Sequence, residues 1–264
     1  MKRRTAVIIS GVLLLVLAVA LSPWLWGPRT HRPVARDLPQ TCRDLAFEAV
    51  VHVVCEIDLG TYDVTLNRLD PSGRPYGSIA EFDRQTVARD VPALLAMNAG
   101  MYHKDLSPVG LYVEDGVVQA PLNLDDGEGN FFMKPNGVFF IGRDGKAGVM
   151  ESAAFAAARP DVLYATQSGP MLVAGGQLHP KFEENGASRY IRNGVCAPGP
   201  DKVVLAISRT AVSLGSFARL FRDGLGCRDA LFLDGDVSTL SDGSRKIVGG
   251  DFPAGPILAV RVKE

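Results

Sequence analysis

The sequence predicts an α+β fold, a single domain built on a mostly antiparallel or mixed sheet with a few helices. Three observations predict this class: short β-branched and apolar runs recur along the chain, Asp-Gly turns join several of them, and only three segments have helical periodicity. The 264 residues are 47% hydrophobic, which is enough to bury a core, so disorder is excluded as the main state.

The N-terminus, taken first, predicts export. A basic stretch, Lys2–Arg4, precedes the apolar run 6–21, which is the pattern of a signal peptide or a membrane anchor. Ala-Val-Ala at 18–20 fits signal cleavage, whereas Trp24 and Trp26 fit an uncleaved anchor in the inner membrane with its basic end in the cytoplasm. Both alternatives stay open, and both place the rest of the chain in the periplasm.

The remaining residues are expected to form a spacer and one folded domain. Pro and Arg are frequent over 27–40, so this stretch is expected to be a spacer after an export segment at 1–26. The rest, 41–264, contains no second low-complexity break and is expected to be one domain. Its predicted strands are 50–57, 62–66, 93–98, 110–113, 138–141, 203–208, 230–233 and 256–262.

Turns and helices complete the predicted elements. Asp-Gly pairs within 114–116 and 143–145 indicate tight hairpins. Helices are expected at 78–88, at the Ala-rich 151–158, and at 213–225, where Leu, Phe and Ala recur at helical spacing.

The charge balance and the spacing of Cys and His residues argue against nucleic-acid binding and against a metal site. Lys and Arg number 28 against 29 Asp and Glu, a net charge of −1 with no basic stripe, so nucleic acid is not expected as a partner. No Cys-x-x-Cys is present, and His103 has no second His or Cys at ligand spacing, so no metal site is predicted. The identity of any cofactor stays open.

Four cysteines follow the export segment, and an even number in an exported chain predicts disulfides. Three pairings are possible, and buried free thiols are the alternative. We favour Cys42 with Cys55, which would join the start of the domain to its first strand. The second pair would be Cys196 with Cys227, which ends the predicted helix before the 230–233 strand.

The most informative segment is the apolar strand 230–233, which ends in Asp234-Gly-Asp236 followed by Ser238. Strand ends present catalytic groups, so both carboxylates are candidate catalytic residues. The Asp-x-Asp string also occurs in aspartate-nucleophile phosphatases, but too few residues follow here to supply the later strands of that fold. A simple Asp-Gly turn capped by hydroxyls is the alternative.

Polar and aromatic side chains elsewhere predict a site for a sugar and a phosphate. Asn both donates and accepts hydrogen bonds, which suits sugar hydroxyls, whereas Arg clusters hold phosphate and aromatic faces stack on sugars. The alternative for each is a turn, a core patch or a solvated rim. These candidates are Asn98, Tyr102, Asn130, Phe131, Lys134, Asn136, Arg189, Arg192 and Asn193.

The order of several motifs resembles the phosphodiester glycosidase domain family, over roughly 91–240. The family includes the lysosomal enzyme that uncovers mannose 6-phosphate by removing a covering N-acetylglucosamine, and the longer strings look most like its bacterial exported branch. The strings are Asn98-Ala-Gly-Met-Tyr, Pro108-Val-Gly-Leu-Tyr-Val-Glu114, Asn130-Phe-Phe-Met-Lys-Pro-Asn-Gly-Val138, Gln167-Ser-Gly-Pro-Met-Leu, Arg192-Asn-Gly-Val, the helix before Cys227, and Leu233-Asp-Gly-Asp-Val-Ser238.

The resemblance implies a hydrolase that splits a glycosidic phosphodiester, or a related sugar linkage in envelope polysaccharide, by attack of water on the anomeric carbon. Asp234 is the first catalytic candidate, with Asp236 or Glu114 as its partner. The sugar phosphate or glycan would lie in one cleft. Its residues would be Asn98, Gly100, Ser168, Gly169, Arg192, Asp234, Gly235 and Ser238.

Roles within that cleft follow from the chemistry of the side chains. Arg192 would hold the phosphate, Asn98 and Ser168 the sugar hydroxyls, and Tyr102 or Phe131 the sugar face. Two positions depart from the family pattern: Asp236-Val237 replaces a glycine-rich tail, and Cys196 replaces a glycine. A non-catalytic glycan-binding or envelope-assembly protein with the same cleft is therefore the alternative.

Overall fold

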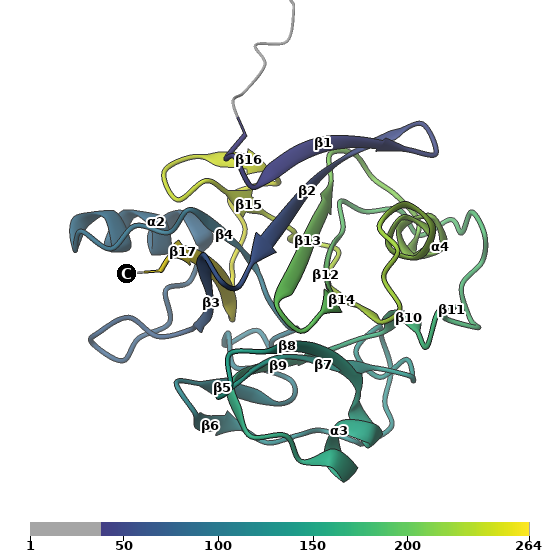
Figure 1. The fold of residues 1–264 in the computed structure, drawn as a ribbon, viewed down its shortest axis with the longest axis horizontal. Coiled ribbons are helices and arrows are strands. Elements are labelled where there is room, and N and C mark those ends of the chain that lie inside the picture. Colours follow the sequence, from purple (N-terminus) through teal and green to yellow (C-terminus); the bar gives the residue numbers. More distant parts are fainter. Residues whose placement is uncertain (1–37, 264) are drawn as a thin grey trace, which may run out of the picture. The chain divides into compact units, whose positions relative to one another are not determined.

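The structure is a computed structural model that describes residues 38–263 (Figure 1). The predicted export segment at 1–26 and most of the spacer at 27–40 lie outside the described residues. Within the described part, every pairing of named strands is antiparallel, the strands form three sheets, and three short helices accompany them. The predicted α+β class is confirmed. None of these helices is long and apolar enough to cross a membrane.

The first sheet contains seven strands. In order across the sheet they are β1 (Cys42–Phe47), β2 (Val50–Asp58), β13 (Lys202–Ser208), β12 (Asn193–Gly199), β14 (Ala230–Asp234), β10 (Met171–Ala174) and β11 (Gln177–Leu178). Side chains of β2 and β13 alternate between two apolar clusters, with Val53 and Leu205 in one and Val54 and Ala206 in the other. Both faces are therefore buried, which is why these strands read as nearly continuous apolar runs.

Helix α4 (Leu214–Arg219) packs against one face of this sheet, where Phe217 joins the cluster that contains Phe232 of β14. The Ser213 side chain begins the helix by accepting a hydrogen bond from the Ser216 backbone N–H at 3.1 Å. The helix predicted over 213–225 is therefore correctly placed. Its second half, however, is a π-helical segment, Leu220–Gly224, rather than a continuation of the α-helix.

The second sheet contains five strands and is covered by helix α2 (Ile79–Ala88). Its order is β16 (Lys246–Val248), β15 (Leu240–Ser241), β4 (Leu95–Asn98), β17 (Ile257–Val262) and β3 (Tyr62–Asn67). Ser78 caps α2 by accepting a hydrogen bond from the Glu81 backbone N–H at 3.1 Å. Phe82 on the apolar side of the helix belongs to the same buried cluster as Ala96 and Ala259 of the sheet.

The third sheet also contains five strands and leads into helix α3 (Ser152–Ala158), which lies at the bottom of Figure 1. Its order is β6 (Val117–Ala120), β5 (Tyr112–Glu114), β9 (Val162–Ser168), β7 (Gly137–Gly142) and β8 (Ala147–Glu151). The Glu151 carboxylate accepts a hydrogen bond from the Ala154 backbone N–H at 2.9 Å and caps α3. The predicted helix at 151–158 is thus present, one residue shorter.

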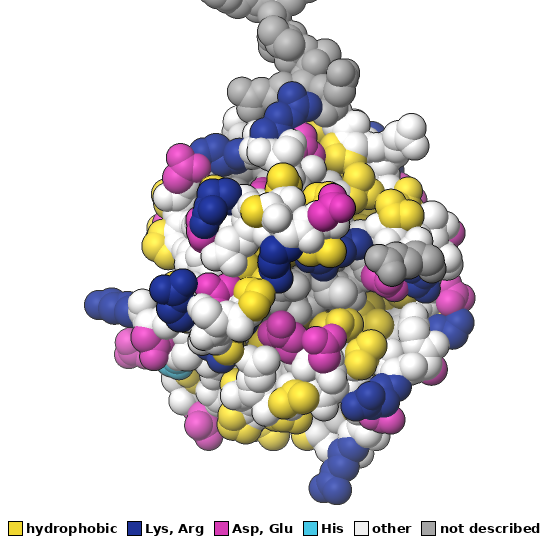
Figure 2. All heavy atoms as spheres, turned by 90° about the vertical axis from the view of Figure 1, so that its left-hand side faces the viewer, with side chains coloured by type: hydrophobic (Ala, Val, Ile, Leu, Met, Phe, Trp, Pro, Cys, Tyr) yellow, Lys and Arg dark blue, Asp and Glu magenta, His cyan; other side chains and the backbone are white. Residues whose placement is uncertain are grey.

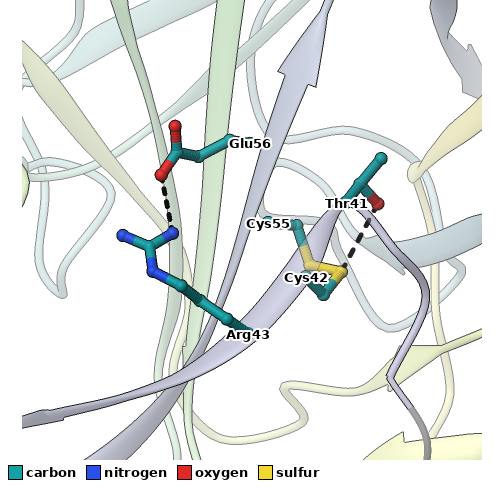
Figure 3. The surroundings of a disulfide bond; sticks show 5 residues. All are labelled: Thr41, Cys42, Arg43, Cys55 and Glu56. Atoms are coloured by element: carbon teal, nitrogen blue, oxygen red, sulfur yellow. Dashed lines mark hydrogen bonds and ion pairs between the residues drawn. A yellow bond between two sulfur atoms is a disulfide. The ribbon is translucent and has the colours of Figure 1, made fainter.

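Both predicted disulfides are present. Cys42 and Cys55 face one another in the β1–β2 pairing and are joined across it (Figure 3). Next to this bridge, Arg43 forms an ion pair with Glu56 at 2.6 Å, also across the two strands. Cys196 of β12 is joined to Cys227. No cysteine in the described part is free.

Charged side chains are mixed on the face of the molecule drawn in Figure 2. Lys and Arg lie between Asp and Glu there, without a separate basic stripe on that face. The sequence-based expectation that nucleic acid is not a partner stays a prediction, because a single face is visible in this view.

Candidate active site

A cleft of about 630 Å³ opens where β14 ends. Loops from all three sheets form its walls, which is typical of ligand sites carried by a rigid sheet scaffold. The lining residues are Met101, Tyr102, His103, Val109, Glu128, Gly129, Asn130, Phe131, Phe132, Ser188, Tyr190, Arg192, Asp234, Gly235, Asp236 and Val237.

Asp234 is the last residue of β14, and both its backbone and its side chain are held. Its backbone N–H donates to Asn193 Oδ1 at 2.8 Å. Its carboxylate Oδ1 accepts hydrogen bonds from the backbone N–H groups of Asp236 at 3.0 Å and Val237 at 3.3 Å. The carboxylate therefore folds back over its own Asp-Gly turn while remaining in the wall of the cleft.

The environment of Asp234 favours its protonated form. The residue is 8% exposed, and this burial raises the pKa of its carboxyl group. The neighbouring charge of Asp236 raises the pKa further, whereas the backbone N–H groups of the turn stabilise the carboxylate and lower it. A buried carboxyl group with a raised pKa in a cleft is a candidate for proton transfer.

A buried polar network supports this turn from behind. The Asn193 side chain donates from Nδ2 to the backbone oxygen of Asn98 at 2.8 Å, which links β12 to β4. Asn98 Oδ1 accepts from the Thr239 backbone N–H at 2.7 Å, and Ser238 Oγ donates to the backbone oxygen of Asp234 at 2.8 Å. Asn98, Asn193 and Ser238 are thus placed beneath the cleft, and none of the three lines it.

Arg192 brings a buried positive charge to the cleft. Its guanidinium donates from Nε to the Val212 backbone oxygen at 2.9 Å and from Nη2 to the Ser188 backbone oxygen at 3.0 Å. The group lies 5.4 Å from the ring centre of Tyr190 and 5.3 Å from that of Phe232. No carboxylate in the described part forms an ion pair with it, although the residue is only 1% exposed.

Burial lowers the pKa of Arg192 to about 10, so the group remains a cation at neutral pH. Its third nitrogen, Nη1, lies beside the Asp234 turn, because a Cβ added to Gly235 would lie 2.9 Å from it. A side chain at 235 would therefore crowd the guanidinium. A buried cation without an acidic partner is costly, and an anionic ligand would stabilise it.

Aromatic side chains form the remaining wall. Tyr102 Oη donates to the Pro253 backbone oxygen at 2.6 Å, and burial together with the charges of Asp234 and Asp236 raises the pKa of its phenol. Phe131 and Phe132 meet edge to face with ring centres 5.0 Å apart. These rings contribute apolar surface to the lining of the cleft.

Several predicted binding residues shape the cleft without lining it. A Cβ at Gly100 would lie 2.4 Å from the Gln167 backbone oxygen, and one at Gly169 would lie 2.5 Å from the Phe131 backbone oxygen. Both glycines therefore allow two backbone segments to meet. Ser168 Oγ donates to the Leu233 backbone oxygen at 3.0 Å, which fixes β9 to β14 and leaves this hydroxyl inside the protein.

Four other candidates do not line the cleft. The Glu114 carboxylate accepts from Tyr112 Oη at 2.9 Å and Gln119 Nε2 at 3.2 Å within the third sheet, so it is not placed beside Asp234. Lys134 forms an ion pair with Asp126 at 2.8 Å. Asn136 donates to the Phe131 backbone oxygen, and Arg189 is exposed outside the cleft. Proximity in sequence to an apolar strand does not specify which side chains face the ligand.

The sequence and the fold are similar to those of known proteins. Residues 92–243 match the family described as phosphodiester glycosidase, or NAGPA. The chain belongs to the phosphodiester glycosidase family. The uncharacterised protein YigE of Escherichia coli K12 is 40% identical over 144 residues, which are 54% of this chain and 56% of YigE. The match therefore spans about half of that relative.

Solved structures share the fold of this phosphodiester glycosidase family member at low identity. The catalytic domain of zebrafish N-acetylglucosamine-1-phosphodiester α-N-acetylglucosaminidase, auto-inhibited by its pro-peptide, has a TM-score of 0.58 at 15% identity, over 84% of this chain and 82% of that one. A hypothetical protein from Synechocystis scores 0.57 at 13%, over 84% and 61%. A putative exported protein from Burkholderia pseudomallei scores 0.52 at 12%, over 80% and 74%.

The structure places both residues at which this family member departs from the family pattern. Asp236 is exposed and lines the cleft. Cys196 is buried in β12 and forms the bridge to Cys227. Sequence analysis missed Tyr190 and Glu128 as lining residues, because an isolated aromatic or acidic residue in a loop carries no periodic signal.

Proposed function

We propose that this protein is an exported hydrolase that cleaves a glycosidic phosphodiester, or a related sugar linkage, on envelope polysaccharide. One observation carries the proposal: the same cleft contains Asp234, a buried carboxyl group with a raised pKa, and Arg192, a buried cation with no acidic partner in the described part. The pair matches a substrate that needs proton transfer next to a negative charge. Membership of the phosphodiester glycosidase family supports the reaction class.

In the proposed reaction, Arg192 binds the phosphate through its side near Gly235. Asp234 removes a proton from water, and the water oxygen bonds to the anomeric carbon of the sugar. The bond from that carbon to the phosphate oxygen breaks, and the phosphate leaves with the electron pair. Because phosphate is a weak base, it needs little help from an acid, so one positioned carboxylate serves the reaction.

The remaining lining residues suit the other parts of the substrate. Tyr102 and Phe131 present aromatic surface to the sugar ring, and Asn130 contributes polar groups at the same wall. Asp236 lies close enough to raise the pKa of Asp234, and the proposed reaction with one carboxylate assigns it no step. Asn98 and Ser168 support the turn and the strands from below instead of binding sugar hydroxyls directly.

Export is part of the proposal. It is supported by the basic stretch followed by an apolar run at the N-terminus, by two disulfides, and by the structural likeness to a putative exported protein. The substrate would then be a glycan or sugar phosphate outside the cytoplasm. An uncleaved segment would keep the enzyme at the inner membrane, and a cleaved one would release it into the periplasm.

The test is turnover of sugar 1-phosphodiesters by purified wild type and Asp234→Asn. Asn keeps an oxygen that accepts the two turn hydrogen bonds but does not take up a proton, so the fold should persist while turnover falls about a hundredfold or more. Glu114→Gln is the matched control, because it neutralises a half-buried carboxylate outside the cleft, and it should keep near-normal turnover.

The outcomes separate the two candidate functions. Near-normal turnover by Asp234→Asn would remove this residue from the mechanism. Absence of sugar release from every phosphodiester, with glycan affinity retained in both variants, would instead favour the glycan-binding protein. That alternative has some support in the structure, since the Asp234 carboxylate is already used to hold its own turn.

A further inference from the structure

A second cavity lies between helix α2 and the β15–β16 hairpin. Its volume is about 340 Å³, near the lower end for a small-molecule site, and it shares no lining residue with the cleft. Asp83 and Val87 contribute from the helix, Ser241 from the hairpin, and Phe252 from the segment that follows β16. The floor and the walls thus come from separate elements that the fold brings together.

Asp83 is a buried carboxylate in the wall of this cavity. The residue is 5% exposed, and its Oδ1 has no hydrogen-bond partner among residues 38–263. Burial raises the pKa of Asp83 to about 6, with a smaller contribution from the charge of Asp242 and an opposing one from the hydroxyl of Ser241. The group is therefore largely ionised at pH 7 while its Oδ1 lacks a donor, which is an unfavourable state for a buried oxygen.

The cations around the cavity are engaged by other acids. Arg84 forms an ion pair with Glu81 at 2.5 Å, Lys246 with Asp251 at 2.8 Å, and Arg245 with Asp242 at 2.7 Å. Asp83 forms no ion pair with any described residue. Because each of these cations is paired with an acid, the rim carries little net charge, and Asp83 Oδ1 remains as an acceptor that a ligand hydroxyl can fill.

An aromatic face completes the site. Phe252 is 42% exposed, and its ring lies against Gly250, where an added Cβ would be 2.4 Å from the ring. Gly250 thus allows the ring to approach the backbone closely. A carboxylate beside an exposed aromatic ring is a combination suited to a sugar, which offers hydroxyl donors at its edge and an apolar face.

We propose that the cavity binds a neutral polyhydroxylated ring, namely one sugar unit, with a hydroxyl donating to Asp83 and a ring face against Phe252. The inference stands on this cavity alone and does not require turnover in the cleft. The two sites are separated by the segment around Pro253, whose backbone oxygen is bound to Tyr102 in the cleft wall. Occupancy of each site can therefore be observed separately.

The experiment is residue-resolved NMR titration of the full-length protein with methyl α-glucopyranoside, with N-acetylglucosamine, and with propylammonium as a cationic comparator. We expect the sugars to shift the backbone amides of Gly243 and Gly250, and propylammonium to leave them unchanged. Asp83→Asn and Phe252→Ala should each weaken sugar binding at these amides at least tenfold. Asp63→Asn, an exposed carboxylate on β3, is the matched control and should bind as wild type does.

Loss of sugar binding by Asp83→Asn can be distinguished from loss of folding. Asp83→Asn removes a buried charge that has no ion-pair partner among the described residues, so its melting temperature at pH 8 should equal or exceed that of wild type. Retained sugar binding in either cavity variant, shifts caused by propylammonium alone, or sugar shifts confined to Gly235 and Val237 would each overturn the proposal. Shifts at those two amides report the cleft, so failure of the cavity proposal is distinguishable from failure of the proposed hydrolase.

Discussion

The carboxylate of Asp234 both holds its own turn and lines the cleft. It accepts the backbone hydrogen bonds of its own turn, and it faces a cleft in which burial raises its pKa. The turn bonds stabilise the ionised form, and the burial stabilises the protonated one. The turn thus fixes the geometry of the carboxylate, whereas the burial sets its affinity for a proton. Chemistry at this position depends on both being retained.

Replacement of Asp236 by glycine should leave the fold intact and preserve or increase turnover. Asp236 is exposed, contributes only its backbone N–H to the turn, and adds a negative charge to a cleft proposed to bind phosphate. Steady-state kinetics on Asp236→Gly with a sugar 1-phosphodiester would measure this, with Glu128→Gln as a second lining acid for comparison. Complete loss of activity in Asp236→Gly would make Asp236 the better catalytic candidate.

His52 should be replaceable with a gain in stability that grows as the pH falls. Both ring nitrogens are buried without a hydrogen-bond partner among the described residues, and burial lowers the pKa of His52 to about 4 against the charge of Glu48. Between pH 6.5 and 4 the unfolded chain therefore binds more protons than the folded one. Folding stability is lost as the pH falls through this window, at about 1.4 kcal/mol per pKa unit.

His52→Leu removes this proton uptake and fills the site beside Phe217 with an apolar group. Denaturant unfolding should show a free energy of unfolding higher by about 2 kcal/mol at pH 5, and a smaller gain at pH 8. His103→Gln, at an exposed histidine, should change the free energy by less than about 0.5 kcal/mol at either pH. An equal gain at both pH values would contradict the assigned role of proton binding.

Elements were predictable where burial leaves a periodic signal. The strands β2 and β14 are apolar on both faces, and the helix α2 begins at a Ser that caps it, so each was found close to its observed place. The strand β12 was missed, because Asn193-Gly-Val-Cys-Ala-Pro-Gly199 has little strand propensity. Its conformation is imposed by hydrogen bonding to β13 and β14 on either side, which is tertiary information.

The candidate site was predictable to a similar degree. Sequence motifs identified Asp234, Arg192 and Tyr102, which line the cleft. Asp234 and Tyr102 follow predicted apolar strands, whereas Arg192 belongs to a stretch in which Arg, Asn and an aromatic residue occur together. The same reasoning selected Glu114 and Lys134. Glu114 instead accepts a hydrogen bond from Tyr112, and Lys134 forms an ion pair with Asp126. Sequence spacing places a residue on an element. The direction in which a loop side chain points depends instead on packing between sheets.

The bridge between Cys196 and Cys227 should stabilise the central part of the first sheet. It ties β12 to the segment before β14 and closes a loop with a sequence separation of 31. In the chain-entropy description, a loop of this length contributes about 3 to 4 kcal/mol. The double variant Cys196→Ala/Cys227→Ala should lose about that free energy in denaturant unfolding, with the Cys42→Ala/Cys55→Ala variant, which opens a shorter loop, losing less. An undiminished free energy would contradict the assignment.

At the scale of the molecule, loops from all three sheets form the cleft. The turn after β14, the loop after β4 and the segment before β7 supply its walls, and the hydrogen bond from Asn193 to Asn98 joins the first two sheets across 95 positions. The region that matches the family, 92–243, omits β2 and β17, which are interior strands of their sheets. The cleft therefore requires the whole described domain, beyond the segment in which its motifs lie.

We expect the whole protein to be exported. This expectation rests on the basic N-terminal stretch and on the two disulfides. The basic stretch at Lys2–Arg4 followed by an apolar run predicts export, and the two disulfides need an oxidising compartment to form and persist. Alkaline phosphatase fused after Gln40 should therefore be active, and β-galactosidase fused at the same place should be inactive. Removal of residues 2–21 should reverse both results, and the same deletion in the full chain should leave its four cysteines reduced. An active β-galactosidase fusion to the intact N-terminus would place the domain in the cytoplasm, where this fold would lack both of its covalent cross-links.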